Sequence, residues 1–350
     1  MNQSGDLLLK TAEALLRSTE DATGATAIDA HYVPNANADD YNALNANADD
    51  ADGYNAPNAD ADGAPVKNSE RQSPFYAGER RGPYYTGERQ SPFYTGERRG
   101  PYFCGVDLGT SSIILVVLNG EGAPVACEMQ ACQVARDGLV VDYMGAVAIV
   151  RRLKEKLERR LGAKLENTAI AVPPGTGRAN AGVHRHIVEA ADMEVVSIVD
   201  EPEAANATLR VENGVVVDIG GGTTGLSVVK DGGVIFSADE PTGGIHISLV
   251  LMGRYKFNYE QAEAWKQDPA NAKDAYAAAL PVLEKMAGIV ERHIRGRSIT
   301  EAWLVGGTSC LPGIERVFAD ILGVPAYKPV SPMLVTPLGI ALCCRAALIG

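Results

Sequence analysis

Residues 217–224 read VDIGGGTT, and this stretch decides the fold when it is set beside residues 106–113, which read VDLGTSSI. In both segments an apolar residue precedes an aspartate, and a turn rich in glycine or hydroxyl side chains leads into a second apolar run. Each second run is followed by a hairpin turn, NGEG at 119–122 and KDGG at 230–233. One strand–turn–strand unit therefore occurs twice, which predicts a chain with two related lobes.

The turn residues of this repeated unit are suited to binding phosphate and a metal ion. Glycine lets backbone N–H groups approach phosphate oxygens closely, and serine and threonine hydroxyls add donors. An aspartate would repel phosphate, but it can hold Mg²⁺ through water, and the metal then neutralises the phosphate charge. Two such turns facing each other would clamp a triphosphate, whereas the plainer interpretation is two ordinary hairpins. The candidate phosphate-binding residues are Gly109, Thr110, Ser111, Gly220, Gly221, Gly222 and Thr223.

Around these turns, strand-like and helix-like patterns alternate from about residue 101 onward, which indicates an α/β fold with helices covering the sheets. The expected strands are 113–118, 169–172, 195–199, 215–219, 226–229 and 303–305. The expected helices are 144–161, 179–191, 201–209, 245–255, 270–294, 312–322 and 337–348.

Four segments, in this order, resemble the actin-fold ATPase domain of DnaK-type heat-shock chaperones. They are GVDLGTSS at 105–112, DEPEAANA at 200–207, VVDIGGGTTGLSVV at 216–229 and LVGGTSCLPGIERV at 304–317. The chain as a whole resembles the EutJ family, the chaperone-like ethanolamine-utilisation proteins of bacterial microcompartment operons, and AVPPGT at 171–176 supports this. The resemblance implies a bilobal actin-like fold, a duplicated RNase H-like α/β architecture with compact subdomains. Lobe I would comprise about 101–200 plus a closing helix at 336–349, and lobe II about 213–330.

The resemblance also implies ATP and Mg²⁺ as ligands. Asp107 and Asp218 would bind Mg²⁺ through water, and Glu201 would sit at a helix N-cap and orient the attacking water. Either Asp218 or Glu201 could be the general base, and for Glu201 an exposed helix cap is the simpler interpretation. The loop Gly306, Gly307 and Thr308 would approach ribose and adenine, while Gly243 and Gly244 would begin a helix near the phosphates. Glu260, Glu263 and Lys266 would either edge the adenine pocket or form a solvated, ion-paired face.

The sequence departs from the chaperone pattern in two respects. No counterpart is recognisable for the lobe I lysine that assists the chaperones' chemistry, because Lys154, Lys156 and Lys164 fit a solvated helix face. Slow hydrolysis, or binding without turnover, is therefore expected. The sequence also stops directly after the closing helix, so a peptide-clamping cycle is not expected of this chain alone.

The first hundred residues differ in character from the rest. Residues 1–20 predict an amphipathic helix, 21–69 an acidic low-complexity linker, and 70–100 a linker of nine-residue Pro/Tyr/Arg repeats. The formal net charge of −12 is shared unevenly: residues 1–69 carry −9, residues 70–100 carry +2 and the remainder −5. No basic patch indicates nucleic-acid binding and no apolar run approaches a membrane span. The six cysteines lack metal-ligand spacing, which favours reduced thiols in the cytoplasm.

The function predicted is that of an ATP-binding, chaperone-like ATPase in ethanolamine utilisation and microcompartment assembly. Residues 1–20 would bind partner proteins, either shell proteins or lumen enzymes of the compartment, and the protein would be cytoplasmic or associated with the compartment. No nucleic-acid or membrane partner is expected. The alternatives are an actin-like filament former and an ATPase that reactivates a cobalamin-dependent lyase.

Overall fold

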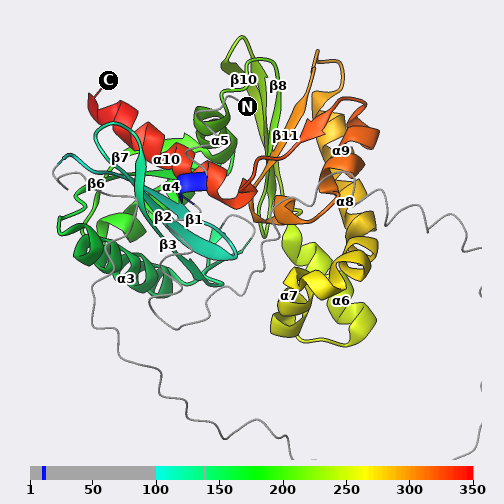
Figure 1. Ribbon diagram of the computed structural model, residues 1–350, viewed down its shortest axis with the longest axis horizontal. Helices are drawn as coiled ribbons and strands as arrows, with labels where there is room; N and C mark the ends of the chain where they lie inside the picture. Colours follow the sequence, from blue (N-terminus) through cyan, green and yellow to red (C-terminus); the bar gives the residue numbers. More distant parts are fainter. Residues whose placement is uncertain (1–9, 13–99, 137–138, 350) are drawn as a thin grey trace, which may run out of the picture. The chain divides into compact units, whose positions relative to one another are not determined.

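The computed structural model describes residues 10–12, 100–136 and 139–349, and every structural statement below concerns these residues (Figure 1). The predicted linker at 21–69 lies outside the described residues, as does the predicted repeat at 70–100 apart from Gly100.

The first sheet has the strand order β3-β2-β1-β6-β7. Strands β1 to β3 form an antiparallel meander, and β6 and β7 extend it in parallel from β1. The strands are β1 (Phe103–Leu108), β2 (Ser112–Leu118), β3 (Pro124–Ala131), β6 (Asn167–Val172) and β7 (Glu194–Asp200). A small ribbon of β4 (Ala135–Arg136) and β5 (Leu139–Val140) leads into α3.

The second sheet repeats that plan with the order β10-β9-β8-β11-β12. Its strands are β8 (Gly214–Ile219), β9 (Thr224–Lys230), β10 (Gly233–Glu240), β11 (Ala302–Val305) and β12 (Ala326–Tyr327). Again three antiparallel strands are extended by two parallel ones. The duplication expected from the two aspartate-bearing turns is therefore present: β1–β2 and β8–β9 are equivalent hairpins at equivalent places.

Helices cover both sheets. In lobe I, α3 (Tyr143–Leu161) and α4 (Arg178–Glu189) bury one face of the first sheet. In lobe II, α8 (Ala272–Ile294) and α9 (Ile314–Leu322) run along one face of the second sheet. Helices α6 (Gly244–Tyr255) and α7 (Tyr259–Gln267) lie at the lower end of α8 (Figure 1). Short 3₁₀ turns, η1 (Pro269–Asn271) and η2 (Gly307–Cys310), precede α8 and follow β11.

The opposite faces of the two sheets share a single apolar cluster, which α5 (Glu201–Leu209) and α10 (Pro332–Ile349) fill. The cluster joins Ile114 and Ala169 of the first sheet to Val216 and Val305 of the second. Packing is tight enough that a Cβ at Gly339 of α10 would overlap the carbonyl of Ala204 in α5. These two helices therefore join the lobes through buried contacts.

Helix α10 begins five residues before the predicted start at residue 337. Pro332 is the first helical residue, and Pro337 lies inside the helix. With a mean hydropathy of 1.8, α10 is long and apolar enough by composition to cross a membrane, contrary to the expectation from sequence. However, 56% of it is buried in this protein, and it contacts β1, β2 and α5, as a core helix does.

Only residues 10–12 of the predicted N-terminal helix are described. They are helical, Lys10 is exposed, and Ala12 is fully buried in the cluster that α10 fills. The amphipathic pattern predicted for 1–20 places Ala12 on an apolar face with Leu8, Leu9, Leu15 and Leu16. At least this residue therefore packs against the folded part of the chain itself.

Candidate nucleotide and metal site

The first glycine–hydroxyl turn connects β1 to β2. Asp107 is the penultimate residue of β1 and Ser111 lies just before β2. The second turn faces it: a Cβ at Gly221 would overlap Ser111 Oγ, and the pKa of Asp107 is shifted by the charge of Asp218. The structure thus brings together the two turns that the sequence predicted as halves of one site.

Backbone hydrogen bonds from the first residues of α6 fix the second turn. The amides of Gly244 and Ile245 donate to the carbonyls of Gly220 and Gly221, at 3.0 and 2.8 Å. Helix α6 begins at Gly244 with Gly243 as its N-cap, as the sequence predicted. Because the Gly244 N–H is already engaged, these first amides fix the position of the turn.

The loop Gly306–Thr308 lies against the same turn, because β11 pairs with β8 and places Val305 opposite Asp218. Gly306 has φ +86°, and a Cβ there would overlap Asp218 Oδ1, so only glycine is accommodated without strain. Thr308 Oγ1 donates to Gly220 O at 2.8 Å. This loop is therefore adjacent to the predicted phosphate-binding turn.

Glu201, Asp107 and Asp218 form a group of carboxylates with raised pKa values. Burial raises the pKa of Asp107 to about 7, with a smaller contribution from the charge of Asp218. Burial likewise raises the pKa of Asp218 to about 6 and that of Glu201 well above its usual value, the charges of Asp218 and Asp107 adding to the latter. Among the described residues, no lysine or arginine contributes to these shifts. The ionised form of the group therefore has no compensating protein charge, and a bound cation would stabilise that form.

Glu201 lies one position further into its helix than predicted. The N-cap of α5 is Asp200, whose side chain makes no capping hydrogen bond, and Glu201 and Pro202 are the first two helical residues. Its pKa responds to four other carboxylates, so it faces the group and is more than an exposed cap.

Two residues that sequence reasoning did not single out complete the surroundings of the group. Thr336, near the start of α10, donates its hydroxyl proton to Asp218 Oδ2. Asp239, on β10, has its pKa raised to about 6, mainly by burial, while a hydrogen bond from Thr223 opposes the rise. Thr336 could have been found from the sequence, because it is a lone threonine in an apolar helix. Asp239 could not, because its position depends on the register between β9 and β10.

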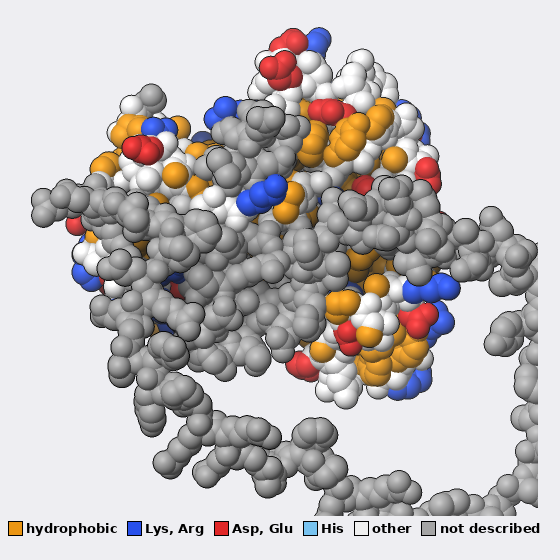
Figure 2. All heavy atoms as spheres, in the orientation of Figure 1, with side chains coloured by type: hydrophobic (Ala, Val, Ile, Leu, Met, Phe, Trp, Pro, Cys, Tyr) orange, Lys and Arg blue, Asp and Glu red, His pale blue; other side chains and the backbone are white. Residues whose placement is uncertain are grey.

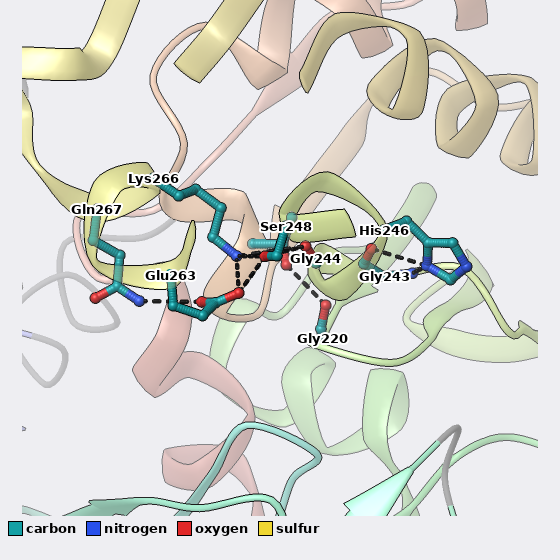
Figure 3. A network of polar contacts seen from close by, with 9 residues as sticks. Gly220, Gly243, Gly244, His246, Ser248, Glu263, Lys266 and Gln267 are labelled. Carbon is teal, nitrogen blue, oxygen red and sulfur yellow. Dashed lines mark hydrogen bonds and ion pairs between the residues drawn. The ribbon is translucent and has the colours of Figure 1, made fainter. Parts of the chain in front are cut away.

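Figure 3 shows the polar network that ties α7 to the start of α6. Lys266 Nζ donates to Glu263 Oε1 at 2.7 Å, to Ser248 Oγ at 2.9 Å and to Gly244 O at 3.4 Å. Burial raises the pKa of Tyr259 to about 12, the charge of Glu263 adds to the rise, and Ser111 opposes it. Glu263 and Lys266 are thus mostly buried and close to the phosphate-binding turns. Glu260 is exposed, which agrees with the alternative of a solvated face for this residue.

The three lysines considered for the missing catalytic lysine lie elsewhere in lobe I. Lys154 and Lys164 pair with Glu158, at 3.1 and 2.8 Å, and Lys156 pairs with Glu128 at 2.9 Å. The expected solvated face is wrong for Lys154, which is buried. No contact joins any of them to the carboxylate group in the described part of the chain.

Comparison with known proteins assigns the family. The chain is 43% identical to the ethanolamine utilization protein EutJ of Salmonella typhimurium over 69% of this chain and 85% of that protein. For EutJ of Escherichia coli K12 the identity is 42%, over 68% of this chain and 84% of the relative. The chain belongs to the EutJ family. The crystal structure of EutJ from Carboxydothermus hydrogenoformans is 48% identical, with a TM-score of 0.66, over 70% of this chain and 90% of the other.

More distant comparisons place this EutJ-family chain among actin-like ATPases. The family model of the cell division protein FtsA matches residues 215–339, and that of the MreB/Mbl protein matches residues 125–262. Chaperone protein DnaK of Thermus thermophilus is 23% identical over 55% of this chain and 42% of DnaK. A PilM–PilN type IV pilus biogenesis complex shares the fold, at a TM-score of 0.59 and 15% identity. The bilobal actin-like fold predicted from sequence is confirmed.

Actin-like ATPases bind nucleotide, usually with Mg²⁺, and the EutJ-family chain has residues that suit both. No group of three or more His, Cys, Asp or Glu side chains in the described ranges is arranged to grip a metal directly. Mg²⁺ tends to keep several of its waters and to be held through few carboxylates. Asp107 and Asp218, buried to different degrees and without a cationic neighbour, fit a hydrated ion held through water.

Proposed function

We propose that this chain is an Mg²⁺-dependent ATP-binding protein that hydrolyses ATP slowly and acts, chaperone-like, in ethanolamine utilisation and microcompartment assembly. The observation that carries the proposal is the approach of the two turns, where Gly221 meets Ser111 beside Asp107 and Asp218. Family membership supports the pathway, since the relatives named above are ethanolamine utilization proteins.

Each part of the site has a chemical role in this proposal. Backbone amides and hydroxyls of the two turns would bind phosphate oxygens, and Asp107 and Asp218 would hold the metal through water. Mg²⁺, when bound, supplies charge neutralisation for phosphoryl transfer. Glu201, at the start of α5, would orient a water and accept its proton, for which a pKa raised above its usual value is suited.

The absence of a cationic side chain at the carboxylate group supports slow turnover. In the described residues, the candidate lysines of lobe I pair with glutamates on α3 and β3 and leave the group without a protein cation. Transition-state charge beside the carboxylates would then be balanced by the metal and by the amides and hydroxyls of the turns, without the lysine that assists the chaperones.

The test is calorimetry with ATP and Mg²⁺ on the full chain, comparing Asp218→Asn with the matched variant Asp231→Asn. Asp231 lies at the exposed tip of the same sheet, in a left-handed conformation that asparagine adopts easily. We expect the Asp218 variant to lose about tenfold or more in affinity for Mg-ATP, and the Asp231 variant to lose nothing. Equal affinities for all three proteins would overturn the site assignment.

The partner proposal concerns residues 1–20, whose amphipathic pattern is suited to binding shell proteins or lumen enzymes. Because Ala12 is buried in the chain's own apolar cluster, a partner would compete with this internal docking. Co-purification with compartment shells, with and without residues 1–20, tests it: unchanged recovery after deletion would refute the role of this segment.

A second candidate, filament formation, is favoured by the FtsA and MreB/Mbl family matches and by exposed apolar side chains. Leu249 and Val250 of α6 and Ile235 of β10 are 53%, 39% and 55% exposed, and Figure 2 shows hydrophobic side chains gathered over α6 and α7. Light scattering and negative-stain microscopy with ATP and Mg²⁺ decide it, since a chain that forms no polymer at high concentration is not a filament former.

A further inference from the structure

The register of the second sheet places two carboxylates on either side of a glycine. Asp218 of β8 pairs with Gly225 of β9, and Gly225 pairs with Asp239 of β10. Residues directly opposite in antiparallel strands point to the same face of the sheet. Asp218 and Asp239 therefore point to one face from strands about 10 Å apart, with no side chain between them.

The equivalent row of paired residues in the first sheet lacks the glycine and the second carboxylate. There Asp107 pairs with Ile114, and Ile114 pairs with Met129. Ile114 is buried in the shared apolar cluster and Met129 packs against it. The duplicated unit thus keeps its first aspartate in both lobes, but of the two sheets only the second has a position without a side chain and a second carboxylate in this row.

The space above Gly225 is enclosed by lobe I. A Cβ at Gly225 would lie 3.3 Å from Pro202 Cγ, 3.5 Å from Pro174 Cδ and 3.5 Å from Asp239 Oδ1. Pro202 follows Glu201 directly, so this space adjoins the carboxylate group. Asp239 consequently belongs to the same enclosure as Glu201 and Asp218, which agrees with its electrostatic effect on Glu201.

One oxygen of Asp239 is left without a hydrogen bond. Asp239 Oδ1 is buried and has no hydrogen-bond partner within the described residues. A buried acceptor without a donor costs about 1–3 kcal/mol, so its retention points to a donor that binds there. The ordinary occupant of such a place is a water held between polar groups.

We infer that Asp239 is a fourth carboxylate of the proposed cation site, with Oδ1 accepting a hydrogen bond from a water of the hydrated Mg²⁺. This inference rests on the proposed function, because it assigns a further residue to the same site. It makes the cation site asymmetric: lobe I contributes Asp107 and Glu201, and lobe II contributes the pair across Gly225.

The probe is Mn²⁺, whose free hydrated form is counted by electron paramagnetic resonance, titrated into the full chain with saturating ADP. Asp239→Asn is expected to weaken Mn²⁺ binding about tenfold, as loss of an outer-shell partner does. ADP affinity measured in EDTA is expected to stay the same, because Asp239 is assigned to the cation and has no contact with nucleotide in this inference.

The matched control is Glu240→Gln, which removes the same charge one residue along the strand. Glu240 pairs with His293 at 2.8 Å, and its side chain points to the other face of the sheet. We expect wild-type Mn²⁺ affinity for this variant. A metal-free melting curve checks the fold of Asp239→Asn, which should melt no lower than the parent because the neutral amide removes a charge that repels Glu201.

The outcomes separate the two proposals. Wild-type Mn²⁺ affinity in Asp239→Asn overturns the inference, and so does an equal loss in Glu240→Gln, since net charge alone would then explain it. If the unmodified chain binds neither ADP nor Mn²⁺, the proposed function itself is wrong.

Discussion

At the scale of single residues, the site is a set of partly or fully buried acids whose protonation is linked to folding. The pKa of Asp107 is raised to about 7 in the folded chain, against 3.8 for an unperturbed aspartate. Between these two pH values the folded form binds more protons than the unfolded form. Stability of the metal-free protein therefore falls as pH rises through this window.

This linkage gives a prediction about Mg²⁺ and pH. In EDTA, the melting temperature of the chain should fall between pH 4 and pH 7 relative to Asp107→Asn, whose amide does not titrate. Added Mg²⁺ should raise the melting temperature more at pH 8 than at pH 5, because the carboxylates are ionised only at the higher pH. Differential scanning fluorimetry measures both, and a Mg²⁺ effect independent of pH would contradict the assignment.

The bond from Thr336 to Asp218 gives a second prediction. Replacing Thr336 with valine keeps the shape but removes the donor, so the free energy of unfolding should fall by about 1–3 kcal/mol. The loss should be larger at pH 8 than at pH 5, since Asp218, with a pKa of about 6, carries its charge at the higher pH.

Thr208→Val is the control for this experiment. The Thr208 hydroxyl donates to the neutral carbonyl of Val335 at 3.0 Å and is equally buried. Urea denaturation of Thr208→Val should show a smaller loss that does not change with pH. If both variants respond alike to pH, the Thr336 bond has no special relation to the ionised Asp218.

At the scale of elements, the strongly patterned segments were predictable from sequence and the long-range pairings were not. Helix α5 occurs at the predicted bounds, and the strands expected at 215–219 and 226–229 are the cores of β8 and β9. Local hydrophobic periodicity suffices for such segments. By contrast β10 shows no clean alternation and was missed, and with it Asp239, because its place follows from register with β9.

The close packing of α10 on α5 gives a third prediction. Gly339→Ala introduces a methyl group into the carbonyl of Ala204, and overpacking of this kind typically costs about 1–3 kcal/mol. Gly288→Ala on α8 is the matched control, since nothing lies within 4 Å of a Cβ there and alanine favours a helix by about 1 kcal/mol. Chemical denaturation should show opposite signs, and a stable Gly339→Ala would contradict the packing described.

At the scale of the whole molecule, the chain divides into a folded ATPase-like part and an N-terminal region of different composition. Deleting residues 1–20 should lower the melting temperature, by about 2–4 °C for each kcal/mol lost, because Ala12 is buried in the shared cluster. Deleting residues 35–97 should change neither melting temperature nor nucleotide affinity, because their composition offers little apolar surface to bury. Calorimetry on both deletions tests this, and the reverse pattern would refute it.

The place of α10 in the fold bears on how the protein is made. Residues 332–349 leave the ribosome after every strand and helix against which they pack, yet they cover a face of β1, among the earliest strands translated. Until α10 is synthesised, the face of the first sheet that α10 will cover stays exposed to solvent in the nascent chain. Apolar surface exposed in this way makes folding intermediates prone to aggregation. Lobe I therefore completes its fold only after translation of lobe II, so the order of synthesis and the order of folding differ.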